Sequence, residues 1–131
     1  MKKNGILNSD IATVLAHLGH TDTIVIADCG LPVPENVRKI DLSIKKGFPG
    51  FLDVLKEVVN DMEIEKVTLA TEIQGQNQSL HMDLKNLFVN TEMELINHED
   101  LKKKTADAKA VIRTGEVTPY ANVILQAGVI F

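Results

Sequence analysis

Apolar residues recur along the chain with two different spacings, which predict helices and strands in alternation. Apolar positions three or four residues apart predict one amphipathic helix over residues 11–18 and another over residues 51–59. Shorter helices are expected over residues 79–88 and 98–104. Gly19 follows the first of these segments, at a position where helices commonly end.

Short runs of β-branched residues, or of alternating apolar residues, predict six strands. They cover residues 23–27, 40–44, 66–71, 94–97, 110–113 and 122–131. Segment 29–34 is expected to be a loop, because its prolines cannot donate to a sheet, and so is the polar segment 74–78. Strands that alternate with helices are typical of an α/β fold. We therefore expect a single layered domain over residues 1–131, with a mixed, mainly parallel sheet of about six strands.

The composition is ordinary for a globular protein and excludes several classes of partner. Apolar residues make up 44% of the 131 residues and charged residues 24%, and the net charge is −4. An acidic balance argues against a nucleic-acid partner. No apolar run is long enough to cross a membrane, and residues 8–10 interrupt any export signal near the N-terminus. The single cysteine, Cys29, cannot form an internal disulfide, so the expected location is the cytoplasm.

His20 and Asp28 lie on either side of the predicted strand at residues 23–27. A histidine can give and take a proton near neutral pH, so His20 is a candidate acid or base, although a surface or capping histidine has the same pattern. His17, His20 and Asp22 could in principle share a metal ion. Gly19 is expected to end the helix between the histidines, so no metal site is predicted.

His98 and Lys102 lie four residues apart and would share one face of the helix predicted over residues 98–104. The basic residues that follow make a solvated face the alternative explanation for Lys102. Asp28 and His98 both come at or just after the end of a predicted strand. In parallel sheets, ligands bind beyond the carboxyl ends of the strands, which singles out these two side chains.

Tyr120 and Asn122 combine an aromatic surface with hydrogen-bond donors and acceptors, which suits a ligand rich in hydroxyl groups. Cys29 has no neighbouring base in the sequence and is interpreted as a small apolar residue in a turn. The chain contains neither a Walker-type phosphate loop nor a glycine-rich dinucleotide motif, so no cofactor is predicted.

Three segments together carry a strong family signal. They are Gly-His-Thr-Asp at 19–22, Ile-Ala-Asp-Cys-Gly-Leu-Pro at 26–32 and Arg-Thr-Gly-Glu-Val-Thr-Pro-Tyr-Ala-Asn at 113–122. With them, the chain resembles the D-ribose pyranase family, which is related to the fucose mutarotases, over essentially its full length. The resemblance implies a three-layer α/β/α fold and an isomerase that interconverts the β-pyranose and β-furanose forms of D-ribose.

The resemblance also implies roles for particular residues. His20 matches the family's proton donor. The positions implied to contact the sugar are Asp28, His98, Lys102, Tyr120, Ala121 and Asn122. Members of the family assemble into rings of five that stack into decamers, and a neighbouring subunit completes each site. The apolar C-terminus at residues 129–131 is expected to pack in the core or against such a neighbour.

Two other functions are compatible with parts of the sequence. A non-catalytic sugar-binding regulator of ribose uptake would bind the same ligand without accelerating the exchange of ring forms. A phosphocarrier that uses His20 would need a phosphate-binding surface around this histidine. Asp22 places a carboxylate there instead, which disfavours the phosphocarrier.

Overall fold

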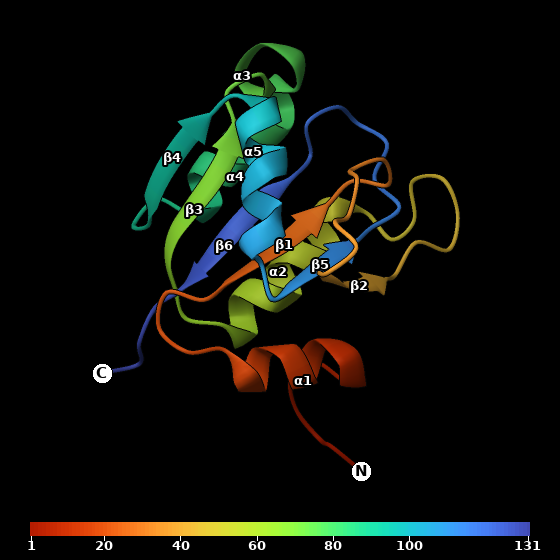
Figure 1. Cartoon of the computed structure of the whole chain (residues 1–131), viewed down its shortest axis with the longest axis vertical. Helices are drawn as coiled ribbons and strands as arrows, with labels where there is room; N and C mark the ends of the chain where they lie inside the picture. Colours follow the sequence, from red (N-terminus) through yellow and green to blue (C-terminus); the bar gives the residue numbers. More distant parts are fainter.

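The computed structural model describes residues 1–131 as one six-stranded sheet with helices on both faces (Figure 1). The strands are β1 (Thr23–Ala27), β2 (Arg38–Asp41), β3 (Ile64–Ala70), β4 (Glu92–Ile96), β5 (Ala110–Arg113) and β6 (Val123–Ala127). Their order across the sheet is β2-β5-β1-β6-β3-β4. Only β6 runs antiparallel to its neighbours, β1 and β3. The prediction of a mixed, mainly parallel sheet of six strands is therefore confirmed.

The helices form the outer two layers. They are α1 (Ser9–His17), α2 (Phe51–Asp61), α3 (Ile73–Gln76), α4 (Gln78–Leu87) and α5 (His98–Lys104), with a short 3-10 turn, η1 (Thr105–Asp107), after α5. Figure 1 shows α5 in front of the sheet and α2 and α4 behind it. The larger apolar cluster contains 20 buried residues and includes side chains of α1, α2 and α4, whereas the smaller cluster of 9 residues includes Leu101 of α5. The three-layer α/β/α expectation is confirmed.

The central strand β1 shows why this sequence needs cover on both faces. Ile24 and Ile26 point into the larger cluster, whereas Val25 and Ala27 point into the smaller one, and all four side chains are buried. Alternate residues of a strand face opposite sides of a sheet, so a continuous apolar run belongs to a strand that is buried on both sides. Each isoleucine or valine buried in this way contributes about 1.5–3 kcal/mol of stability.

Most of the predicted elements are confirmed, but the expected loop at residues 74–78 is wrong. Residues Ile73–Gln76 form α3, and the helix α4 begins at Gln78. The buried side chain of Ile73 anchors this short helix in the larger apolar cluster. A single buried residue among polar neighbours gives no helical periodicity, so tertiary packing determined a structure that the local pattern did not indicate.

Two predicted strands end earlier in the structure than the sequence suggested. The strand expected over residues 40–44 ends at Asp41, whose carboxylate accepts a hydrogen bond from the Ser43 backbone N–H at 3.0 Å and turns the chain. The strand expected over residues 122–131 ends at Ala127. Ile130 and Phe131 are exposed beyond it, so the terminus does not pack in the core of its own chain.

None of the helices combines the length and the apolar character that crossing a lipid bilayer requires.

Candidate functional site

Asp28 and Asn122 form the centre of a polar cluster at the carboxyl end of β1. The Asn122 side-chain amide donates to Asp28 Oδ2 at 2.8 Å, and its carbonyl oxygen accepts the Asp28 backbone N–H at 3.0 Å. Asn122 is fully buried, while Asp28 is only partly buried. The other carboxylate oxygen, Oδ1, accepts the Gly30 backbone N–H at 2.9 Å. These bonds hold the Asp28 carboxylate in one orientation at the edge of the sheet.

Tyr120 and His98 lie beside each other in this region. Their ring centroids are 5.1 Å apart and the ring planes are nearly perpendicular, at 84°. Tyr120 has a positive φ of 57°, an unusual backbone conformation for a residue other than glycine. Asn77 supports the preceding turn, because its amide donates to the Pro119 carbonyl at 2.9 Å. The structure therefore places an aromatic ring and an imidazole together, a combination of apolar and polar groups that suits a ligand-binding surface.

His98 begins α5 directly after β4, where Glu72 holds its backbone. Both carboxylate oxygens of Glu72 accept the His98 N–H, at 3.1 and 3.0 Å. The ring atom Nδ1 of His98 is buried and has no hydrogen-bond partner. A buried polar atom without a partner costs about 1–3 kcal/mol, so this nitrogen is a natural acceptor or donor for a ligand.

Lys102 lies one helical turn after His98, as the sequence predicted, but its ammonium already has a partner. Lys102 Nζ is 2.8 Å from a carboxylate oxygen of Glu99. This hydrogen bond lowers the pKa of Glu99 below its usual value, against a smaller opposing effect of burial. A sugar hydroxyl that reached Lys102 would share it with Glu99.

His20 does not lie with the other predicted site residues of the same chain. It precedes β1, whereas Asp28 follows this strand, so the two residues are at opposite ends of the sheet. A strand rises about 3.3 Å per residue, which separates the two ends of β1 by roughly 13 Å. The partner of His20 is instead Glu65, whose Oε2 is 2.8 Å from His20 Nε2. The residues predicted for one site thus fall into two groups at opposite ends of β1.

The other polar residues considered near the two ends of β1, His17, Asp22 and Cys29, make separate contacts. His17 Nδ1 is 2.7 Å from the Thr13 carbonyl oxygen of its own helix. Asp22 accepts the Gly19 N–H at 2.9 Å and pairs with Lys109 at 3.4 Å. These two residues and His20 therefore do not converge on one point. Cys29 is partly buried in the loop after β1, and its backbone N–H donates to the Glu116 carbonyl.

The segment before Tyr120 is held by contacts with the sheet and with α2. Thr114 is buried and donates from its hydroxyl to the Ala27 carbonyl at 2.8 Å. Glu116 accepts the backbone N–H of Phe51, the first residue of α2, at 3.2 Å. Gly115 packs directly against the backbone of Phe48, where any Cβ would overlap. These contacts position the turn that carries Tyr120 and Asn122.

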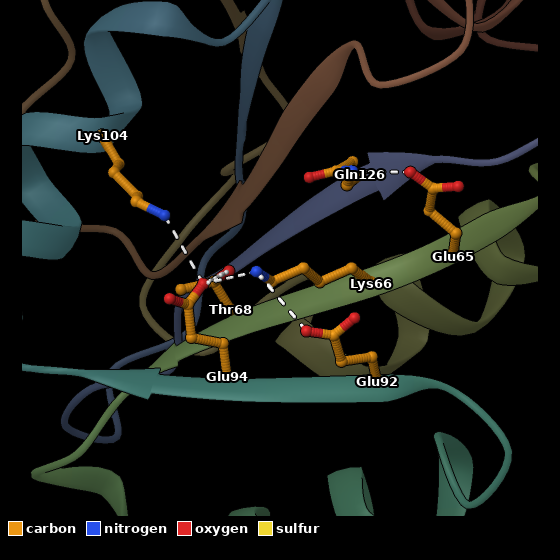
Figure 2. Close-up of polar contacts among 7 residues, drawn as sticks. All are labelled: Glu65, Lys66, Thr68, Glu92, Glu94, Lys104 and Gln126. Carbon is orange, nitrogen blue, oxygen red and sulfur yellow. Dashed lines mark hydrogen bonds and ion pairs between the residues drawn. The ribbon is translucent and has the colours of Figure 1, made fainter.

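A second polar network covers β3 and β4 on the face that α5 borders (Figure 2). Lys66 lies between Glu94, at 3.0 Å, and Glu92, at 3.6 Å, and Lys104 approaches Glu94 from α5 at 3.5 Å. The hydrogen bond from Lys66 lowers the pKa of Glu94, and the same bond raises the pKa of Lys66. Figure 2 also shows the Gln126 amide bonded to Glu65, at 2.6 Å.

Comparison with known proteins decides the family. The model of the RbsD / FucU transport protein family matches residues 1–130. The chain belongs to this family. It is 58% identical to a D-ribose pyranase of Bacillus cytotoxicus and 59% identical to one of Bacillus cereus, in each case over 131 residues that cover both chains completely.

Solved structures of RbsD / FucU proteins share the fold. The structure of Bacillus subtilis RbsD complexed with D-ribose superimposes with a TM-score of 0.98 at 60% identity, over the whole of both chains. A fucose mutarotase of Streptococcus pneumoniae in complex with L-fucose reaches a TM-score of 0.78 at 21% identity, over 95% of each chain, and shares the fold.

Sequence reasoning missed the carboxylates that support the candidate residues of this RbsD / FucU chain. Glu65 contacts His20, and Glu72 holds the backbone of His98. Both lie on or after β3, far along the chain from their partners, so no spacing in the sequence connects them. The only local signal for Glu65 is a break in alternation, because two consecutive charged residues, Glu65 and Lys66, fall between Ile64 and Val67.

Proposed function

We propose that this protein is a D-ribose pyranase, an isomerase that interconverts the β-pyranose and β-furanose forms of D-ribose in ribose catabolism. The observation that carries the proposal is the full-length match, at 60% identity and a TM-score of 0.98, to a relative solved with D-ribose. The arrangement of polar groups around Asp28 supports it, since this surface offers acceptors, donors and an aromatic edge to a small polyhydroxy ligand.

The sugar binds among the residues at the carboxyl end of β1 and the start of α5. The fixed carboxylate of Asp28 accepts a hydroxyl, and the buried Nδ1 of His98 gains the partner that it lacks in the free protein. Tyr120 provides an aromatic edge. The remaining contacts come from the backbone of Ala121, from Asn122, which also orients Asp28, and from Lys102.

The reaction requires only proton transfers. Opening a cyclic hemiacetal places a proton on the ring oxygen and removes one from the anomeric hydroxyl. Closure through a different hydroxyl reverses both transfers, so every group returns to its starting state. His20 is the proton donor, because an imidazole exchanges protons readily near neutral pH. No electron is transferred, so the proposed mechanism requires no cofactor.

The site is built from two copies of the chain. Within one chain His20 and Asp28 lie at opposite ends of β1, too far apart to reach one monosaccharide. In a ring of subunits, His20 of a neighbouring copy can complete the sugar-binding surface around Asp28. We propose that the assembly is a decamer of two stacked pentameric rings and that it works in the cytoplasm, as the resemblance to D-ribose pyranases and the lone Cys29 suggest.

Saturation-transfer NMR on D-ribose tests the activity. The protein should increase transfer of magnetisation between pyranose and furanose signals. His20→Ala should lower the catalysed exchange rate about 10²–10⁴-fold while the fold is retained. Ribose binding with no increase in exchange would instead favour the sugar-binding regulator. A folded His20→Ala variant with the wild-type exchange rate would remove His20 from the mechanism.

A further inference from the structure

Glu65 lies between two side chains at the end of the sheet that carries His20. One carboxylate oxygen, Oε2, is 2.8 Å from His20 Nε2, and the other, Oε1, accepts the Gln126 amide at 2.6 Å. Gln126 is part of β6, and Figure 2 shows its amide pointing at Glu65. The Gln126 amide, more than His20, lowers the pKa of the Glu65 carboxyl, so this group remains ionised at neutral pH.

An irregularity in β3 places Glu65 in this position. Ile64 pairs with Ala127 and Lys66 pairs with Gln126, which are consecutive residues of β6. Glu65 is therefore an extra residue of β3 without a pairing partner in β6. Ile64 consequently packs against the larger apolar cluster together with Val67, and Glu65 remains exposed between them. A bulge of this kind redirects a side chain and is frequent next to active sites.

Gly128 has no side chain, which leaves room for Glu65. A Cβ at Gly128 would lie 3.2 Å from the Cβ of Glu65, tighter than ordinary van der Waals contact. The chain returns from β6 past this point, and the Gly128 N–H donates to the Glu63 carbonyl at 2.9 Å. The bulge in β3, the missing side chain at Gly128 and the hydrogen bond from the Gln126 amide thus all help to position the Glu65 carboxylate.

We propose that Glu65 is a positioning residue that binds Nε2 of His20 and thereby presents Nδ1 to the sugar. The proposal rests on the proposed function for His20 and adds which ring nitrogen exchanges the proton. An ionised carboxylate can only accept a hydrogen bond, so Nε2 must carry a hydrogen. In the neutral ring Nδ1 is then the free acceptor, and in the charged ring Nδ1–H is the donor for the ring oxygen.

Asp22 lies two residues after His20 in the chain and pairs with Lys109 at 3.4 Å. Asp22 also accepts the Gly19 N–H, which lowers the pKa of its carboxyl. Asp22 is therefore engaged with other partners. Glu65 is the carboxylate that bonds the imidazole.

NMR of the histidine rings tests the proposal without using activity. The intact protein, labelled with ¹⁵N-histidine, carries 4 histidines, and His20→Ala identifies the signal of His20. At a pH where the ring is neutral, His20 should carry its hydrogen on Nε2. Glu65→Gln should keep this tautomer, because an amide oxygen still accepts the hydrogen bond, whereas Glu65→Ala should give a mixture. An unchanged tautomer in Glu65→Ala would overturn the proposal.

Kinetics of the same variants test the consequence for catalysis. Glu65→Ala should lower kcat about three- to tenfold with little change in KM, since it leaves the sugar contacts intact. In a His20→Ala background the same change should have no further effect. Glu92→Gln is the matched control, because it removes a carboxylate from the same face without touching His20, and it should retain wild-type kinetics. An equal loss from Glu65→Ala with and without His20 would refute the positioning role. Full activity of His20→Ala would remove His20 from the mechanism, and wild-type protein that does not accelerate ribose exchange would refute the proposed function.

Discussion

At the scale of single residues, the reciprocal bonds between Asp28 and Asn122 explain how the proposed sugar-binding surface is held in one arrangement. The carbonyl oxygen of Asn122 accepts a backbone N–H while its amide donates to a carboxylate, so the side chain fits in only one of its two orientations. Asn122 is fully buried, where an unpaired polar group is costly. The pair therefore contributes both to the site and to the stability of the fold.

Asn122→Asp should destabilise the protein more at neutral than at acidic pH. The substitution replaces an amide donor with a second carboxylate that faces Asp28 Oδ2. We expect a loss of about 1–3 kcal/mol in the free energy of unfolding at pH 7, measured by urea titration. The loss should shrink near pH 4, where the two carboxyl groups can share a proton. The exposed Asn90→Asp is the control, and equal losses in the two variants would contradict this account.

Acid should remove a second contribution, from the pair formed by Lys66 and Glu94. Because the hydrogen bond from Lys66 lowers the pKa of Glu94 in the folded protein, this pair stabilises the fold above the unfolded pKa and is lost as the pH falls through the folded value. Glu94→Gln should therefore lower Tm at pH 7, and this effect should shrink as the pH falls below the usual pKa of a glutamate. A difference in Tm that stays constant with pH would show that the ionised pair is not its source.

At the scale of elements, apolar patterns that repeat along the chain predicted helices and strands. Features that depend on pairing with a distant strand were missed. The apolar run of β1 and the amphipathic pattern of α2 were enough to place both elements. The early end of β6 was not predictable, because the pairing of Ala127 with Ile64, not the apolar pattern, determines where the sheet stops. The bond between Asp28 and Asn122 depends in the same way on the register of β1 against β6.

The turn between β5 and β6 should depend on Gly115. Its backbone packs so closely on Phe48 that an added Cβ would overlap main-chain atoms. Gly115→Ala should therefore lower the free energy of unfolding by about 1–3 kcal/mol and weaken ribose binding, because the same segment carries Tyr120 and Asn122. Denaturant unfolding and calorimetry would measure the two effects. Gly75→Ala, in α3 with open space around it, should leave both unchanged or slightly raise stability.

At the scale of the whole molecule, the exposed apolar surface is what the proposed assembly would cover. Ile130 and Phe131 extend past the last strand with 91% and 100% of their surface exposed, and Ile44 and Phe48 are exposed on the loop after β2. Large apolar side chains in water favour association. In the proposed shared site, the separation of His20 from Asp28 would give this association a role in catalysis.

Deletion of residues 129–131 should lower both the mass of the assembly and the exchange rate. Each apolar side chain buried at an interface contributes about 1.5–3 kcal/mol, and the loss is repeated at every copy. Light scattering with a parallel exchange assay would measure both quantities against the 14.4 kDa mass of a single chain. Val89→Ser, an exposed apolar change in the loop before β4, should affect neither. A truncated protein that remains fully assembled and active would show that the terminus is not part of the interface.

A site shared between copies can be tested most directly by complementation. His20→Ala and Asp28→Asn should each be almost inactive alone. When the two variants are co-expressed with different tags and mixed assemblies are purified through both tags, some sites combine the intact His20 of one chain with the intact Asp28 of its neighbour. Random mixing predicts about a quarter of wild-type ribose exchange. Mixed assemblies as inactive as either parent, when wild-type chains with the same tags are fully active, would contradict the shared site.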